Sequence, residues 1–129
     1  MELIVNHLGN VRFEALARGH RVVSDQPPEM KGSDQGMTPP ELLLASLGTC
    51  AGYYAAEYLR TRSLPSDGLQ IKVTAEKVKA PARLDAFKIE VTLPGLDPRH
   101  EAGVLRAVKF CLIHNTLLNA PAIETTLRT

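Results

Sequence analysis

The chain has few of the residues that mark several specialised classes of protein. It contains no Trp and only three Phe and three Tyr, so an aromatic surface that stacks nucleic-acid bases is not expected. Its two cysteines are too few for a disulfide-rich secreted scaffold. Its formal net charge of +1 provides no strong field for a nucleic acid or an anionic membrane. We therefore expect a soluble globular protein that binds neither nucleic acid nor an anionic membrane.

Long apolar runs are also absent. The longest uncharged stretch, residues 42–56, is interrupted by Ser, Thr and Gly and is shorter than the ~20 apolar residues of a membrane span. Residues 1–5 have no basic region followed by a long apolar segment, so no signal peptide is expected. We therefore expect a cytoplasmic protein whose thiols are reduced.

The 129 residues, 44% of them hydrophobic and 22% charged, suit a single domain spanning residues 1–129. Short alternating segments between turn residues predict strands at residues 3–8, 11–17, 21–24, 69–75, 86–93 and 122–127. Gly-Asn at 9–10 and Gly-His at 19–20 predict tight turns, and the residues around Pro81 join a second hairpin. Residues 25–38 form a polar loop of a length that is often functional or mobile.

The strongest helix signal begins at Thr38. This residue can cap a helix, the two prolines at 39–40 suit its first turn, and Glu41 lies near the positive end of the dipole. Apolar residues at 3–4 spacing continue to Arg60 or Arg62. The helix is apolar on almost every side, which predicts a place at the centre of the protein or of an oligomer.

A second helix is predicted from Asp97 and Pro98, which suit the N-cap and the first helical position. Glu101 then occupies the capping-box position. The expected buried face consists of Val104, Val108, Cys111 and Leu112. Residues 115–119 form a short helix or a turn. Strands that cluster, with few helices between them, indicate an α+β fold.

The two cysteines, Cys50 and Cys111, are far apart in the sequence and form no Cys-x-x-Cys motif. Each is expected on the apolar stripe of a helix, where cysteine most often packs as a small hydrophobic residue, although two such helices could bring the thiols face to face. A reactive thiol needs a lowered pKa. Because Cys50 lies in mid-helix, its own helix dipole cannot supply this, and a cation from the N-terminal strands would be needed. Those strands offer Arg12, Arg18 and Arg21.

Other chemistry finds less support in the sequence. Glu41 precedes Cys50 by nine residues, about 13 Å along a straight helix and on the opposite face. It could act only through an intermediary such as an arginine, or across a symmetric interface. A zinc site of Cys50, Cys111 and His114 has no fourth ligand nearby in sequence, and His114 is expected at a helix end. No nucleophile elbow, P-loop or dinucleotide-binding glycine motif is found, so no cofactor is expected.

Two segments resemble one known family. Residues 36–50 read GMTPPELLLASLGTC, which resembles the signature of the OsmC/Ohr family, the osmotically induced and organic-hydroperoxide-resistance proteins. Residues 109–117, KFCLIHNTL, resemble the motif around the second cysteine of that family, in which Pro usually stands in the place of Leu112. The resemblance extends from about residue 12 to the end of the chain. Residues 18–27 look more like the OsmC-like branch than like Ohr itself.

The resemblance implies an OsmC-like fold, with antiparallel sheets around a long central apolar helix, in an intertwined homodimer whose active sites lie at the interface. It also implies a thiol peroxidase that reduces organic hydroperoxides without metal or cofactor. Cys50 would be the attacking thiolate and Cys111 would resolve its sulfenic acid as a disulfide. An external dithiol or a lipoylated protein would then reduce this disulfide.

In this family an Arg–Glu pair typically flanks the first thiol. Glu41 matches the glutamate, and Arg18 is the first choice for the arginine, with Arg21 as the second. The alternative function is a non-catalytic dimeric module that binds a small apolar ligand and uses its cysteines for packing.

Overall fold

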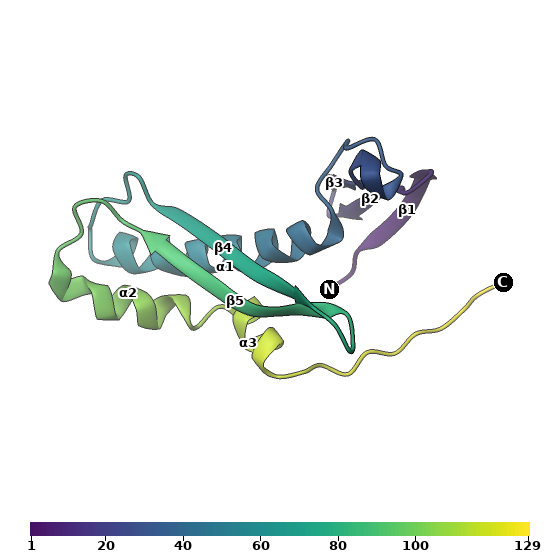
Figure 1. Cartoon of the computed structure of the whole chain (residues 1–129). Helices are drawn as coiled ribbons and strands as arrows, with labels where there is room; N and C mark the ends of the chain where they lie inside the picture. The colour runs from purple at the N-terminus through teal and green to yellow at the C-terminus, as the bar shows by residue number, and fades with distance from the viewer. The chain divides into compact units, whose positions relative to one another are not determined.

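A computed structural model describes all residues, 1–129, and divides the chain into two compact units (Figure 1). The N-terminal unit is Met1–Leu43 and the C-terminal unit is Leu44–Thr129. Both contain antiparallel strands, which follow one another in runs and do not alternate singly with helices along the chain. This arrangement confirms the predicted α+β class.

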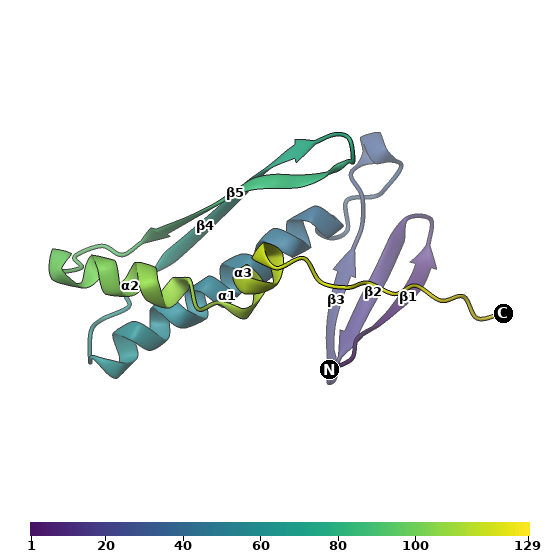
Figure 2. The same ribbon diagram turned by 90° about the horizontal axis from the view of Figure 1, so that it is seen from below.

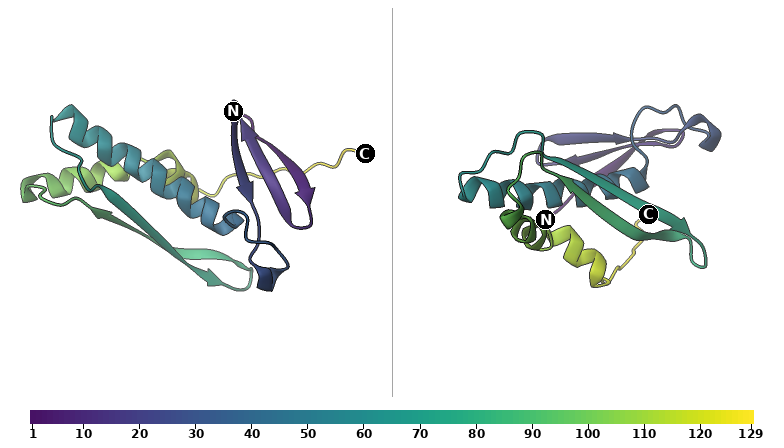
Figure 3. Two further views of the ribbon diagram at one scale, coloured as in Figure 1. Left: turned by 90° about the horizontal axis from the view of Figure 1, so that it is seen from above. Right: turned by 60° about the vertical axis from the view of Figure 1, so that its left-hand side comes forward.

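The N-terminal unit is built on a three-stranded antiparallel sheet (Figure 3). Its strands, in the order β1-β2-β3, are β1 (Ile4–Gly9), β2 (Arg12–Ala17) and β3 (His20–Ser24). The first turn has positive φ at Gly9 (106°) and Asn10 (51°), and the second at Arg18 (50°) and Gly19 (80°). Left-handed backbone at these sites explains why Gly and Asn mark the turns in the sequence. The first predicted turn is confirmed, and the second lies one residue earlier than predicted, at residues 18–19, because His20 already belongs to β3.

A buried carboxylate organises the loop that follows β3. Asp25 is only 2% exposed, and it accepts backbone N–H groups from Gln26 at 2.8 Å, Gln35 at 3.0 Å and Ser33 at 3.3 Å. The bonds from Gln35 and Gln26 lower the pKa of Asp25 against the opposing effect of burial. The loop also contains a 3-10 turn, Pro28–Met30. Sequence analysis did not identify Asp25, and the loop it anticipated has this defined structure.

Helix α1 (Pro39–Thr61) begins where the sequence predicts. The Thr38 hydroxyl donates to Glu41 Oε1 at 2.7 Å, and the N–H of Thr38 donates to the same oxygen at 3.4 Å. The N–H of Glu41 donates in turn to Thr38 Oγ1 at 3.4 Å, which completes a reciprocal capping box. The residues of α1 that are buried are Leu47, Ala51, Ala55 and Leu59. Tyr53 is 61% exposed, so α1 is not covered on every side.

In the C-terminal unit the hairpin formed by β4 (Gln70–Val78) and β5 (Arg83–Thr92) lies along α1 (Figure 1). Gly48 and Gly52 of α1 face this hairpin, and a Cβ atom on Gly48 would lie 3.0 Å from Val73 Cγ2. The absence of a side chain at Gly48 therefore lets the helix approach the strand closely. The core residues shared by α1 and the next helix are Ala51, Ala55, Val104 and Val108.

The two strands of the hairpin, β4 (Gln70–Val78) and β5 (Arg83–Thr92), are longer than the alternating segments 69–75 and 86–93 that predict them. The pairing register shifts between Thr74 and Glu76. A bulge of this kind interrupts the in-out alternation while the strand continues. The alternation in the sequence therefore ends before the strand does.

The polypeptide then returns along α1 through two short helices, α2 (Glu101–Val108) and α3 (Leu112–Leu118) (Figure 2). Asp97 caps as predicted, because its Oδ1 accepts the N–H of Arg99 at 3.0 Å. The capped element is a single 3-10 turn, Pro98–His100. Glu101 is the first residue of α2, so its predicted capping-box position is wrong.

The predicted buried face of this region is confirmed at Val104, Val108 and Cys111, which are 3%, 6% and 0% exposed. Leu112 is 62% exposed, so its predicted burial is wrong. The physical reason is that α2 ends at Val108 and a new helix begins at Leu112. The 3–4 spacing of one helix does not continue across that break.

Residues 122–127 do not form the predicted closing strand. Residues 120–129 contain no helix or strand, and Ile123 and Leu127 are 85% and 88% exposed. A strand requires a hydrogen-bonded neighbour, and this segment pairs with none of the five strands of the chain. No helix of the chain combines the length and the apolar character that a membrane crossing requires.

Candidate active site: a dithiol at the start of α3

The return of the chain along α1 brings the two cysteines together. Cys50 lies in the middle of α1 and is partly exposed, and Cys111 lies just before α3 and is fully buried. Both thiols are free, and they lie close enough for each to shift the pKa of the other. The predicted possibility of face-to-face thiols is therefore confirmed in the C-terminal unit. Cys111 does not lie on the helix stripe, as was expected, but in the turn between two helices.

The start of α3 provides the hydrogen-bond donors of the site. Cys111 is the N-cap of this helix, and its Sγ accepts the N–H of His114 at 3.3 Å. The N–H groups of Leu112 and Ile113 point to Cys50. First-turn N–H groups have no partner within their own helix. Here they are directed to the two sulfur atoms.

These donors make the two thiols chemically different. Burial alone would raise the pKa of Cys50, but the Cys111 thiol and the N–H groups of Ile113 and Leu112 lower it below its ordinary value. For Cys111, burial raises the pKa and its contact with Cys50 raises it further, against the N–H of His114. The pair can therefore hold one thiolate, at Cys50, beside one protonated thiol, at Cys111.

The other predicted site residues belong to the N-terminal unit. Arg21 Nε pairs with Glu14 Oε2 at 2.6 Å, and this bond lowers the pKa of Glu14. Arg18 is exposed and takes part in none of the four ion pairs of the structure. Glu41 is engaged by Thr38 in the capping box. The roles of Arg18, Arg21 and Glu41 at the thiol remain predictions.

The remaining candidates from the sequence are His114 and Arg12. The imidazole Nδ1 of His114 lies 3.4 Å from the carbonyl oxygen of Lys109. No group of three or more His, Cys, Asp or Glu side chains is gathered so that it could hold a metal ion. Arg12, the third arginine of the N-terminal strands, has a buried Nε without a hydrogen-bond partner.

The backbone donors of Leu112 and Ile113 are not evident from the sequence. Because Cys50 lies in the middle of its own helix, the sequence pointed to an arginine as the group that lowers the Cys50 pKa. The signal that would have identified them is a helix start directly after Cys111. That start is hidden in the sequence because α2 and α3 read as one apolar stripe.

The chain belongs to the OsmC-like protein family, whose sequence pattern matches residues 32–126. This confirms the resemblance of the two cysteine motifs. No curated protein matches the chain.

Solved structures of the family share this fold. A protein of Psychrobacter arcticus 273-4 described as an osmotic stress induced and detoxification response protein is 20% identical, with a TM-score of 0.80 over 88% of this chain and 85% of its own. An OsmC-like protein of Mycoplasma pneumoniae is 18% identical, with a TM-score of 0.76 over 92% and 87%. An organic hydroperoxide resistance protein OsmC of Legionella pneumophila is 14% identical, with a TM-score of 0.61 over 92% and 88%.

The backbone donor at Leu112 can be removed selectively. In the variant Leu112→Pro the N–H is lost, but proline is well tolerated at the first position of a helix. Cys111, at ψ 124°, is already outside the helical region that a following proline disfavours. We expect the pKa of Cys50 to rise, so the pH midpoint of its alkylation by iodoacetamide moves upward. Peptide mass spectrometry locates the modified cysteine.

The matched control is Leu112→Ala, which keeps the N–H and shortens a side chain that is 62% exposed. It should leave the midpoint where it is in the unchanged protein. An equal shift in both variants, or a shift in neither, would show that this N–H does not stabilise the thiolate.

Proposed function

We propose that the protein is a two-cysteine peroxidase that reduces organic hydroperoxides to alcohols. The observation that carries the proposal is the polarised contact between the two thiols, in which the pKa of Cys50 is lowered and that of Cys111 is raised. A thiolate is the nucleophilic form of cysteine. Cys111, which keeps its proton, therefore does not compete with Cys50 for the hydroperoxide.

The reaction has two steps on the protein. The Cys50 thiolate attacks the outer oxygen of the hydroperoxide, so the S–O bond forms, the O–O bond breaks and the alkoxide takes a proton to leave as an alcohol. The Cys111 thiol then attacks the sulfur of the Cys50 sulfenic acid, which forms the S–S bond and releases water. An external dithiol, free or on a lipoylated protein, supplies two electrons and two protons to restore both thiols.

Relatives support the substrate class. The OsmC-like family includes proteins described as organic hydroperoxide resistance proteins, among them those of Legionella pneumophila and Elizabethkingia anophelis. In a related protein of Vibrio cholerae, captopril, a thiol, is bound in one of the active sites. A site that accepts a small organic thiol suits an external thiol reductant.

The proposal assigns Arg18 to the activation of Cys50 and Glu41 to holding that arginine. Arg18 follows the last residue of β2 and precedes Gly19 in a left-handed turn, and it has no carboxylate partner of its own. Arg21 is less suited, because Glu14 already holds it at 2.6 Å. A guanidinium stays charged at any working pH and favours a neighbouring thiolate.

The protein is also proposed to act as a homodimer. Five apolar side chains of α3 and the C-terminal segment are 40% to 88% exposed: Leu112, Leu117, Leu118, Ile123 and Leu127. Both outer edges of the β4–β5 hairpin lack a strand partner. Exposed apolar surface and open strand edges of this kind are typical of an interface.

The two thiols should respond differently to substitution. Treated with one equivalent of cumene hydroperoxide, the reduced protein should lose two hydrogen masses as the disulfide forms. Cys111→Ser should consume one equivalent and gain one oxygen as a stable sulfenic acid, and Cys50→Ser should remain unchanged. Intact-protein mass spectrometry and the alcohol yield measure these outcomes. Equal reactivity of the two variants would contradict the assignment of roles.

Substitution of Arg18 should change the pKa of the Cys50 thiol. We expect Arg18→Ala to raise the pKa of Cys50 and to slow its reaction with hydroperoxide, and Glu41→Ala to do so more mildly. Thiolate absorbance against pH measures the shift. Arg21→Ala is the comparison, because that residue flanks the same turn. If neither arginine variant moves the titration, the activation by arginine is wrong.

Dimer formation can be measured directly. Sedimentation velocity of the reduced protein at micromolar concentration should give a single species of twice the chain mass. A purely monomeric protein under these conditions would refute the dimer.

A further inference from the structure

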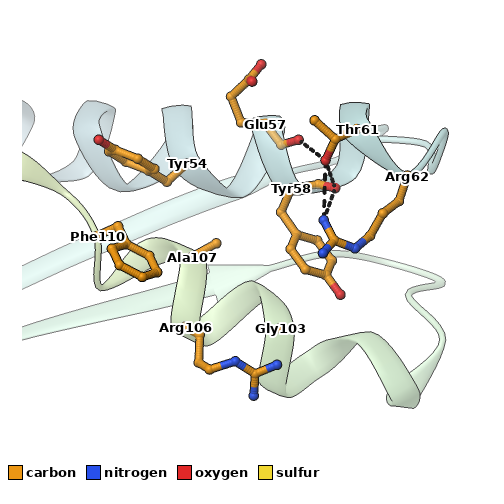
Figure 4. Close-up of a pocket in the computed structure, with 9 residues that line it drawn as sticks. All are labelled: Tyr54, Glu57, Tyr58, Thr61, Arg62, Gly103, Arg106, Ala107 and Phe110. Carbon is orange, nitrogen blue, oxygen red and sulfur yellow. Dashed lines mark hydrogen bonds between the residues drawn. The ribbon is translucent and has the colours of Figure 1, made fainter.

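An open groove lies between α1 and α2 beside the dithiol (Figure 4). Its volume is about 340 Å³, at the lower end of the ~300–1,000 Å³ that is typical of small-molecule sites. Tyr54, one helical turn after Cys50, lies at one end, and Phe110, the residue before Cys111, lies opposite it. The groove contains neither cysteine and belongs entirely to the C-terminal unit.

The walls of the groove are largely aromatic. Tyr54 of α1 and Phe110, in the turn that follows α2, approach each other (Figure 4), and Tyr58 continues the same side of α1 one turn further on. Phe110 is 69% exposed, although a side chain of this kind is ordinarily buried. An apolar chain or ring that lies against Phe110 would remove this surface from water.

The charge of the groove is positive. Its only carboxylate, Glu57, is held by Arg60 through two hydrogen bonds of 2.6 and 2.9 Å. Arg62 and Arg106 also line the groove, and neither belongs to any of the four ion pairs of the structure. The groove is therefore lined by two arginines without a carboxylate partner, and its one acidic residue is already paired.

Arg62 is fixed in place for this role. Its guanidinium carbon lies 3.7 Å from the centre of the Tyr58 ring, and its Nη1 donates to the Tyr58 carbonyl and the Thr61 hydroxyl, both at 3.3 Å (Figure 4). The hydroxyl of Tyr58 is in turn 3.0 Å from His100 Nδ1. These contacts use Nη1 and leave Nε and Nη2 of Arg62 available as donors. Arg106 extends from α2 away from α1 in Figure 4, so Arg62 is the anchor.

We propose that this groove binds an amphipathic carboxylate, with the carboxylate on Arg62 and the apolar part against Tyr54 and Phe110. A guanidinium with two adjacent free donors matches the two oxygens of a carboxylate. A cationic ligand is disfavoured, because Arg62 already covers the face of Tyr58 that would attract it. The proposal concerns binding alone and holds whether or not the thiols reduce a peroxide.

The test uses octanoate and its neutral analogue octanamide, with the full chain in ~0.15 M salt so that long-range charge effects are screened. Dissociation constants come from amide NMR shifts, followed at Gly103, Ala107 and Phe110. Octanoate should shift these amides and bind at least about fivefold more tightly than octanamide, since a hydrogen bond to a charged group contributes more than a neutral one.

Two variants at the C-terminal end of α1, Arg60 in its last turn and Arg62 just after it, locate the anchor. Arg62→Gln should weaken octanoate binding by about tenfold and remove the preference over octanamide. The matched control Arg60→Gln removes a cation that does not line the groove but frees the Glu57 carboxylate that does, so it should weaken octanoate binding clearly less than Arg62→Gln and should keep the preference over octanamide. The proposal is overturned if the two ligands bind equally to the unchanged protein, if the groove amides do not shift, or if Arg60→Gln weakens binding as much as Arg62→Gln.

Discussion

The site depends on the register in which α2 lies against α1. Gly103 of α2 faces Tyr58 of α1 so closely that a Cβ atom on Gly103 would overlap the Tyr58 ring, and Tyr58 is hydrogen-bonded to His100 at 3.0 Å. Cys50 precedes Tyr58 by eight residues, and Cys111 follows Gly103 by eight. The two helices run in opposite directions. This close approach therefore brings the cysteines opposite each other about 12 Å from Tyr58, toward the N-terminus of α1.

The register also determines what surrounds the sulfur atoms. The chain leaves α2 at Val108 and begins α3 at Leu112, so the turn between the helices lies opposite the middle of α1. A continuous helix in that position would present only side chains to Cys50. The break presents the N–H groups of Leu112 and Ile113 instead. A partly buried sulfur can hold a negative charge there without a metal ion or a cation from its own helix.

Local signals in the sequence predicted most of the elements. The Gly-Asn turn at 9–10, the capping pair Thr38 and Glu41, and the Asp97 cap are short-range features whose chemistry is complete within a few residues. The two cysteine motifs predicted the family. Features that depend on distant contacts were missed. The hydrogen bonds of Asp25 join residues up to ten positions apart, and nothing in the alternation of residues 70–78 reveals where the register of β4 shifts.

The errors have one common cause, which is that a pattern of apolar residues does not show what covers it. Residues 122–127 alternate like a strand, but a strand also needs an edge to pair with, and the five strands of the chain leave this segment unpaired. Leu112 continues the spacing of α2, but the helix has already ended. In both cases the sequence shows apolar residues but does not identify what would pack against them, and in the structure these residues are exposed.

The use of first-turn N–H groups as sulfur ligands makes the ionisation of Cys50 and the folding of α3 a single linked equilibrium. These groups point to Cys50 only while the seven residues of α3 are helical. Whatever frays that helix makes Cys50 a weaker acid, and by the reciprocity of linked equilibria the ionised sulfur favours the helix to the same extent. The acidity of this thiol therefore reports the order of a segment that lies some sixty residues away along the chain.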